Sequence, residues 1–316
     1  MTQGTAGDVT IDNGTTALGV QGTVSGNLVL TSGEAITDSA ALSVLGTTTV
    51  TTDVADKTIT LDSLASTGAV LLTTSGTTGD VVIDNGTTAL DLGASTISGT
   101  LSATSGAAAG IVDSGNIAVS GDVTLTTDAN NGVINVGTLQ QSGGDLVLTT
   151  NGSGDATVVN NAAIDFGASS VGGALSATAS AGTITQNGGT LTVAGTSAFT
   201  TSTADQAVTL SNTANALTGA VSLTTSGTAG DVTIDNGTTA LGVQGTVSGN
   251  LALTSGGAIT DSGALNVSGT TTVTTDVDDI TITLGTLAST GNVILTTQGT
   301  AGDVTIDNGT TALGVQ

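Results

Sequence analysis

The chain has 316 residues, 37% of them hydrophobic, and carries 25 acidic side chains against a single basic one, for a formal net charge of −24. It lacks Cys, His, Trp, Tyr and Pro, and its only aromatic residues are Phe166 and Phe199. This composition excludes a disulfide framework and thiol chemistry, and its negative charge disfavours nucleic acid as a partner. Abundant Val, Ile, Leu and Thr with 48 glycines predict many short strands joined by turns.

The chain starts with MTQGTAGDVT, which has neither the charged nor the apolar region of a signal peptide. We interpret this start as an initiator methionine that precedes a repeat already under way, so we expect the chain to be a fragment. No 18-residue apolar run that could span a membrane follows. We therefore predict no membrane insertion.

One segment, GTAGDVTIDNGTTALGVQ, occurs three times without change, at residues 4–21, 227–244 and 299–316, and an altered copy fills 76–93. An enzyme needs a few unique residues held in one place, which such duplication does not provide. Self-similarity of this kind is instead typical of a repeat array.

A shorter motif begins with Gly, alternates polar and apolar residues, and ends in Thr followed by Thr, Ser or Ala. Successive copies are about 20–31 residues apart, and every third gap is long, so that three gaps form a module of about 74 residues. We expect one continuous array with approximate modules 1–41 (partial), 42–116, 117–190, 191–264 and 265–316 (partial). The motif glycines are Gly26, Gly46, Gly68, Gly99, Gly121, Gly144, Gly173, Gly195, Gly219, Gly249, Gly269 and Gly291.

Each motif is predicted to be a strand, because its apolar residues alternate with period two. The second and fourth positions after Gly point inward on this interpretation, and their stacking would give two aliphatic ladders. Phe199 would lie between Leu223 on one side and the small Ala177 on the other. The inner ladder positions that we single out are Leu30, Leu72, Leu125, Leu148, Phe199, Leu223, Leu253 and Leu295.

A strand that returns at short intervals with the same residues inward can stack on itself in parallel. Further alternating runs at 57–63, 79–86, 206–212 and 279–285 supply additional strands for each rung. The predicted fold is therefore all-β, a parallel β-helix of about 12 rungs of 20–31 residues, with three rungs in each module of about 74 residues. A β-propeller is the alternative, but the average period of about 24 residues is too short for a blade.

The runs GGTLTVAGTSAFTT, VSGNLALTSGGAITDSGALNVSGTTTVTT and GTITQNGG resemble the repeat regions of large bacterial surface and secreted exoproteins of the filamentous-haemagglutinin type. The resemblance covers nearly the whole chain. It implies export, a right-handed coil, and a role as a stalk, an adhesin shaft or a surface filament. The adhesive tip of such a protein has no counterpart in this segment, so a binding function of the tip does not transfer.

Catalysis has few candidate groups. Besides carboxylates only Lys57 is available, and the equivalent position is Ile280 when the chain is shifted by the offset between the identical segments at 4–21 and 227–244. We interpret Lys57 as a surface substitution. Paired aspartates such as Asp8 and Asp12 are four residues apart on a strand, which separates them by about 13 Å and is too far for glycoside hydrolysis. We predict that the chain is not an enzyme and has no cofactor.

Calcium is the one metal that the acidic composition makes a candidate ligand. One ion needs several oxygens at about 2.3–2.6 Å, which a single aspartate pair of this spacing does not supply. The alternative interpretation is solubilising charge and turn chemistry, since Asp-Asn-Gly is a turn sequence. The weak calcium candidates are Asp8, Asp12, Asp80, Asp84, Asp231, Asp235, Asp303 and Asp307.

Thr occupies the fifth position after Gly in all twelve motifs. A flat ice-binding face would require a second regular threonine column, but Val29 and Leu71 interrupt that column. We instead expect a stacked threonine ladder between rungs. Sugar binding would need exposed aromatic side chains, and none is expected.

The predicted function is structural. We expect an extracellular or cell-surface β-solenoid that forms the stiff shaft or filament of a bacterial adhesin-like protein. Two alternatives stay open: a subunit that assembles head to tail with copies of itself, and a binding surface on the loops of the long rungs, which would line one side. The expected partners are the chain itself and a host or neighbouring cell surface.

Overall fold

The computed structural model describes residues 7–315, and the described residues fold into strands and connecting loops, without a helix that could span a membrane. The described residues fall into two compact units, which divide between Asn161 and Ala162 and are called unit 1 and unit 2 in chain order. Each unit is a parallel β-solenoid, which confirms the predicted fold class. Our interpretation of the chain start falls largely on residues 1–6, outside the described residues.

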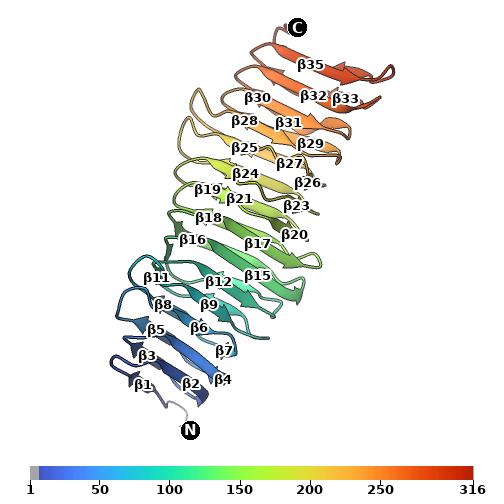
Figure 1. The fold of residues 1–316 in the computed structure, drawn as a ribbon. Helices are drawn as coiled ribbons and strands as arrows, with labels where there is room; N and C mark the ends of the chain where they lie inside the picture. The colour runs from blue at the N-terminus through green and yellow to red at the C-terminus, as the bar shows by residue number, and fades with distance from the viewer. Residues whose placement is uncertain (1–6, 316) are drawn as a thin grey trace. The chain divides into compact units, whose positions relative to one another are not determined.

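Unit 1 alternates between two parallel sheets, as Figure 1 shows from blue to green. Sheet one consists of β1 (Val9–Asp12), β3 (Leu28–Ser32), β5 (Thr48–Thr52), β8 (Val70–Thr73), β10 (Leu90–Leu92), β11 (Ser95–Ile97), β13 (Ile111–Asp113), β14 (Ile117–Val119), β16 (Ile134–Gln141) and β18 (Ala156–Asn160). Sheet two consists of β2 (Leu18–Val24), β4 (Ile36–Val44), β6 (Ile59–Leu61), β7 (Leu64–Ser66), β9 (Val81–Asp84), β12 (Leu101–Ser105), β15 (Val123–Asn130) and β17 (Leu146–Asn151).

Unit 2 has the same construction. Sheet three consists of β21 (Leu175–Ala179), β24 (Ser197–Thr201), β27 (Val221–Thr224), β29 (Leu241–Val247), β31 (Ile259–Val267), β33 (Ile282–Leu284), β34 (Leu287–Ser289) and β36 (Val304–Ile306). Sheet four consists of β19 (Ile164–Phe166), β20 (Ser169–Val171), β22 (Ile184–Gln186), β23 (Leu191–Val193), β25 (Val208–Leu210), β26 (Ala216–Leu217), β28 (Val232–Asp235), β30 (Leu251–Ser255), β32 (Thr271–Asp278) and β35 (Val293–Gln298).

One turn takes one strand, or two short consecutive strands, from each sheet of a unit. Successive turns of unit 1 begin at positions 9, 28, 48, 70, 90, 111 and 134, and those of unit 2 at positions 175, 197, 221, 241, 259, 282 and 304. One turn therefore takes about 21 residues in either unit. The described chain makes about 14 turns, not the 12 rungs that we predicted from the motif alone.

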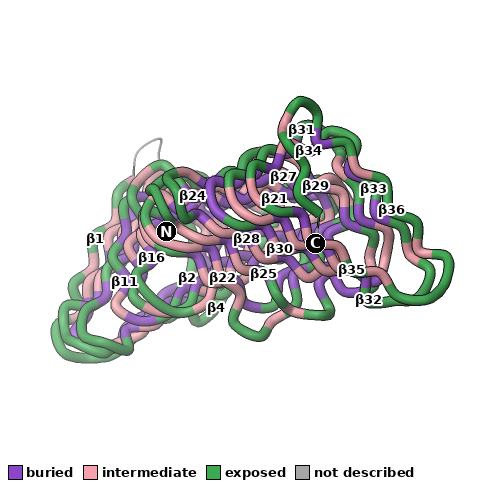
Figure 2. Tube along the Cα trace, turned by 90° about the horizontal axis from the view of Figure 1, so that it is seen from above, coloured by how far each residue is buried: buried purple, intermediate pink, exposed green. Residues whose placement is uncertain are grey.

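The core is aliphatic and follows the alternation of the strands. In β17, Leu146 and Leu148 are fully buried while Val147 between them is not. Figure 2 shows the same alternation along the tube, with exposed residues concentrated in the loops. Because parallel stacking places like positions above one another, Leu125 pairs in register with Leu148, and each buried row extends across several turns.

The largest side chains of the core lie in unit 2. Phe199 pairs with Ala177 in the strand before it and with Leu223 in the strand after it. Its ring meets that of Phe166, from the opposite sheet, edge to face with 6.3 Å between centroids. A small residue beside a large ring keeps the interior densely packed. Of the predicted ladder residues, Leu295 is half-buried and the following are buried: Leu30, Leu72, Leu125, Leu148, Phe199, Leu223 and Leu253.

Hydroxyl pairs occupy the inward positions where the motif carries Thr instead of an aliphatic residue. The Thr48 hydroxyl bonds that of Ser66 across the core at 2.9 Å, and Thr271 bonds Ser289 in the same way at 2.9 Å. All four side chains are buried. A buried hydroxyl needs a hydrogen-bond partner, so Thr at one of these positions is matched by Ser on the facing sheet.

The long gaps between motifs contain one and a half turns, not one long rung. The motif strands that follow Gly26, Gly46 and Gly68 lie in sheet one, whereas those that follow Gly99 and Gly121 lie in sheet two. Our expectations of a single long rung in every third gap and of three rungs per module are therefore wrong. The module comprises three and a half turns, because β9, β10 and β11 occupy the long gap without matching the motif.

This half turn sends equivalent segments to opposite sheets. In unit 1, VTID of β1 lies in sheet one, but its counterpart VVID of β9 lies in sheet two. In unit 2, VTID of β28 lies in sheet four and the identical residues 304–307 begin with β36 in sheet three. The DNGTT loops therefore alternate between the two edges of a unit. They do not line one side, as the binding-surface alternative assumed.

Candidate functional site

Aspartates that bond the following turn are the most regular polar feature of the molecule. In each case a carboxylate oxygen accepts a backbone N–H from a residue 19 to 25 positions later. We call the ten described residues of this kind inter-turn aspartates. They are Asp8, Asp38, Asp56, Asp80, Asp113, Asp122, Asp205, Asp231, Asp261 and Asp279.

Three inter-turn aspartates have an unusual backbone. Asp56, Asp205 and Asp279 each have φ of 62°, a left-handed conformation that Asp tolerates better than most residues. One carboxylate oxygen of Asp56 accepts the N–H groups of Thr77 and Thr78 at 2.6 and 2.9 Å. Asp205 and Asp279 bind the corresponding N–H pairs of their following turns. These bonds hold the carboxylate in its charged form.

The same hydrogen bonds shift the titration of these groups. Backbone donors at Thr77 and Thr78 lower the pKa of Asp56 below its ordinary value, and Thr228 with Ala229 does the same to the pKa of Asp205. Ala301 and Thr300 lower the pKa of Asp279.

Asp38 behaves in the opposite way. Burial is the main cause that raises its pKa, although the N–H groups of Ser63 and Asp62 act against the shift. Burial therefore shifts the pKa of Asp38 in the direction opposite to that in which backbone donors shift the pKa of Asp56.

The predicted calcium candidates divide into two structural roles. The first aspartate is an inter-turn aspartate in three of the four pairs, as in Asp8, which accepts the Asn27 N–H at 2.7 Å; Asp303, in the fourth pair, is exposed and is not one of them. The second closes its own loop: Asp12 accepts the Gly14 N–H at 2.9 Å. Asp80 and Asp84, and Asp231 and Asp235, repeat this division, and Asp307 accepts from Gly309. Among residues 7–315 no three acidic side chains are grouped to hold a metal ion.

The asparagine of the IDNG sequence is buried and bonds the preceding turn in three of the four copies, at Asn85, Asn236 and Asn308. The Asn85 side chain accepts the Ser66 N–H at 2.7 Å and donates to the Ser66 carbonyl at 3.0 Å. Its amide also donates to the carbonyl of Ala89 in its own loop at 2.7 Å. We interpreted IDNG as a turn sequence at the surface. The aspartate does close the turn there, but the asparagine beside it has no exposed surface.

Lys57 forms an ion pair with Glu34 on the neighbouring turn, with Nζ 2.9 Å from Oε2. These are the only lysine and the only glutamate in the sequence. At the offset that separates the identical segments 4–21 and 227–244, Lys57 corresponds to Ile280 and Glu34 to Gly257, so both partners are replaced together. The pair is partly exposed, and such pairs contribute little to stability.

The motif glycines are explained by close contact between turns. A Cβ at Gly68 would lie 2.5 Å from the carbonyl oxygen of Gly46, its counterpart one turn earlier. Gly291 meets Gly269 in the same way. The glycine column therefore lets successive turns approach at the corner, where any side chain would force them apart.

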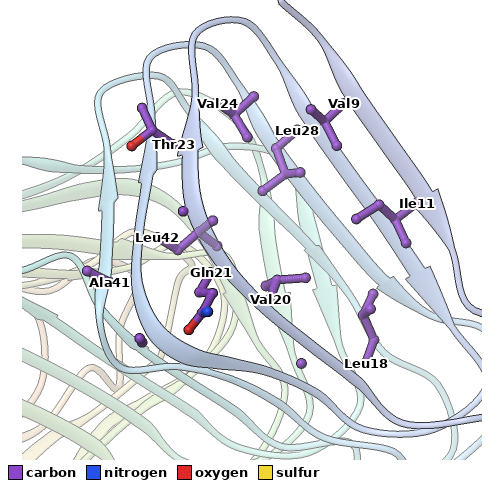
Figure 3. Close-up of a pocket in the computed structure, with 13 residues that line it drawn as sticks. Val9, Ile11, Leu18, Val20, Gln21, Thr23, Val24, Leu28, Ala41 and Leu42 are labelled. Carbon is purple, nitrogen blue, oxygen red and sulfur yellow. The ribbon is translucent and has the colours of Figure 1, made fainter. Parts of the chain in front are cut away.

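An apolar groove of about 680 Å³ opens beside the first described turn of unit 1. Figure 3 shows Val9, Ile11, Leu18, Val20 and Leu28 around it. In the identical sequence at 227–244 of unit 2, β25 pairs with β28 and β27 pairs with β29, so that the corresponding strands are covered by the preceding turn. The groove thus exposes a surface that is interior wherever a preceding turn is present.

Threonines stack on the outer face of the sheets. In unit 2, Thr178, Thr200, Thr224 and Thr246 pair successively in register across four strands. Neighbouring outward positions carry Ser176, Ala198, Ser222 and Gln244 instead.

A family model of repeats of unknown function matches residues 6–77, 78–135, 153–224 and 229–296. The first match contains β1 to β8 and the last contains β28 to β35, so each spans seven half turns. No curated protein and no solved structure matches the chain. The matches at 6–77, 153–224 and 229–296 thus have the same half-integral number of turns as the structural module, whereas the match at 78–135 is shorter.

Proposed function

The chain belongs to the family of repeats of unknown function DUF5649, and from its stacked turns we propose that it is a structural segment without catalytic activity. Its role is to give length and stiffness to a larger protein on the surface of a bacterium or outside it. The extracellular location and the adhesin-like context derive from the resemblance to exoprotein repeats. The stiffness derives from the polar contacts between turns.

The hydrogen bonds that polar side chains make between turns support this role most directly. Ten described aspartates accept N–H groups from the next turn, and Asn85, Asn236 and Asn308 bond the turn before. These groups are distributed along the array and do not converge on one place. They add directional bonds at many of the interfaces between turns, and in a repeat protein those interfaces determine stability.

Pulling the chain by its ends in an optical trap tests the mechanical role. Turns of about 21 residues should detach in steps of about 70 Å each. A variant with Asp56→Asn, Asp205→Asn and Asp279→Asn should show the same steps at lower force. Smooth extension at low force, without steps, would contradict a mechanical role.

Antibody labelling of intact cells of the source organism tests the location. The proposal requires labelling before the cells are permeabilised, with a cytoplasmic protein as the negative control. Labelling only after permeabilisation would show that the chain functions inside the cell.

The groove of unit 1 favours a second candidate function, head-to-tail assembly with another copy. In unit 2, Val208 and Leu210 cover Val232 and Ile234, which are the counterparts of Val9 and Ile11 in the identical sequence. A turn of a second copy offers the same kind of cover to the groove. Such a contact does not close on itself and therefore generates fibres.

Electron microscopy across a concentration series tests the assembly. Filaments should form, and Ile11→Asp should abolish them because Ile11 lines the groove. Thr10→Asp is the matched control, since the neighbouring Thr10 is exposed and does not line the groove. Discrete particles at all concentrations, or equal effects of the two variants, would exclude this contact.

A further inference from the structure

Seven asparagines are followed directly by glycine, and this dipeptide is the one most prone to spontaneous deamidation because glycine leaves its backbone nitrogen sterically open. The structure places these asparagines in different environments. They are Asn13, Asn85, Asn131, Asn151, Asn187, Asn236 and Asn308.

In the Asp-Asn-Gly loops two features of the structure oppose deamidation. Gly86 and Gly237 donate their N–H to Asp84 and Asp235 at 2.8 and 2.9 Å, so the nitrogen is engaged away from the asparagine side chain. Asn85 is fully buried, and four hydrogen bonds to the backbone fix its amide group. The Asn236 amide is held by the corresponding contacts with Leu217, Thr239 and Ala240.

Asn131 is protected in another way. Its Oδ1 accepts the N–H and the hydroxyl of Ser153, both at 2.8 Å. The Gly132 N–H donates to the Ala129 carbonyl at 3.0 Å. The attacking nitrogen and the amide that it would attack are therefore engaged with different partners.

Asn151 differs from all of these. It ends β17 and is exposed, as is Gly152. The Gly152 nitrogen donates to the side-chain Oδ1 of Asn151 itself at 2.8 Å, which holds that nitrogen beside the amide carbon. The side chain also donates from Nδ2 to the Asp128 carbonyl at 3.2 Å.

We propose that Asn151 is a site of spontaneous deamidation in the folded protein, and that it reacts before Asn85, Asn131 and Asn236. The Gly152 nitrogen attacks Cγ of Asn151 and loses its proton to water or hydroxide. The bond from Cγ to Nδ2 breaks and ammonia leaves, which forms a five-membered succinimide. Water then opens the ring at either carbonyl and gives an aspartyl or isoaspartyl residue at position 151.

The modification would change the contact between two turns. Nδ2 is lost with the ammonia, and with it the donor to the Asp128 carbonyl. The product adds a negative charge to a chain of formal charge −24. After the reaction, the side chain at position 151 can no longer donate a hydrogen bond to the Asp128 carbonyl of the neighbouring turn.

Peptide mapping of the wild-type protein after incubation at mildly alkaline pH tests the proposal. Trypsin is unsuitable because the chain has one Lys and no Arg. Cleavage before aspartate isolates Asn151 in 145–154 and Asn85 in 84–90, each as the sole asparagine of its peptide. The same protein unfolded in urea supplies the intrinsic rate at every site.

The proposal predicts that Asn151 reacts in the folded protein at close to its unfolded rate. Asn85 and Asn236 should react about tenfold or more slowly than in the unfolded chain, because they must wait for local opening. Asn151→Gln should remove the early product and leave the slow sites unchanged. Equal rates at all sites, or protection of Asn151 matching that of Asn85, would overturn the proposal.

Discussion

The side chain of Asn85 pairs with both backbone hydrogen-bonding groups of Ser66, accepting its N–H at 2.7 Å and donating to its carbonyl at 3.0 Å. The amide thereby takes the place of a neighbouring strand at the end of β7. Asn236 and Asn308 make the same pair of bonds with Leu217 and Ser289. Each of these interfaces between turns is thus closed by one buried amide.

Asn236→Ala should therefore destabilise unit 2 by about 1–3 kcal/mol, because it leaves the N–H and carbonyl of Leu217 without partners in the interior. Asn13→Ala is the matched control in the identical sequence, where the amide is half-buried and donates to Thr16 and Ala17 of its own loop. Denaturant unfolding followed by circular dichroism measures both. Equal losses of unfolding free energy in the two variants would show that the contact of Asn236 with the preceding turn contributes nothing to stability.

Leu148→Ala should cost about 2–5 kcal/mol, because it leaves a cavity in a fully buried row. Val147→Ala in the same strand removes an outward side chain and should change the free energy of unfolding by much less. The two variants truncate opposite faces of β17. An unchanged unfolding midpoint for Leu148→Ala would disprove the inward assignment.

Gly68→Ala tests the close approach of turns at the corner. The added methyl group would lie 2.5 Å from the Gly46 carbonyl oxygen, and relieving such overpacking typically costs about 1–3 kcal/mol. Gly137→Ala is the control, since a Cβ there meets no atom within 4 Å. A loss of stability confined to Gly68→Ala is expected. Comparable melting temperatures for both variants would refute the explanation of the glycine column.

Acid should weaken the interfaces held by Asp56, Asp205 and Asp279. Their folded pKa values are lowered by backbone hydrogen bonds, so their contribution is present above the unfolded pKa of about 3.9 and is lost as the pH falls through the folded value. Unfolding midpoints measured at a series of pH values report this loss. The triple variant Asp56→Asn, Asp205→Asn and Asp279→Asn should lose less stability on acidification than the wild type, and parallel profiles would contradict the assignment.

The fold class could be predicted because alternation is a local property. Leu146, Val147 and Leu148 already indicate a strand with one buried face, and repetition of that pattern indicates stacking. The number of turns could not be obtained from the motif. The strands VVID at 81–84 and LDL at 90–92 do not match it, yet they carry the chain through the additional half turn.

The inter-turn aspartates were missed for a related reason. Asp56 and the N–H groups that it binds are 21 and 22 residues apart, and no local pattern joins them. A signal does exist: Asp56, Asp205 and Asp279 are each followed one turn later by Gly-Thr, at Gly76, Gly227 and Gly299. These glycines have positive φ, and a side chain there would collide with the aspartate. The spacing becomes informative only once the turn length is known.

Disulfide trapping in this cysteine-free chain shows most directly whether the motif changes sheets after every third copy. Thr73 pairs with Thr96 in sheet one, whereas Thr104, the next motif threonine after Thr73, pairs with Thr126 in sheet two. We predict that Thr73→Cys with Thr96→Cys oxidises readily, as does Thr104→Cys with Thr126→Cys, since parallel neighbours lie within disulfide reach. Thr73→Cys with Thr104→Cys should stay reduced. Efficient oxidation of this last pair, with none between positions 73 and 96, would contradict the half-integral module.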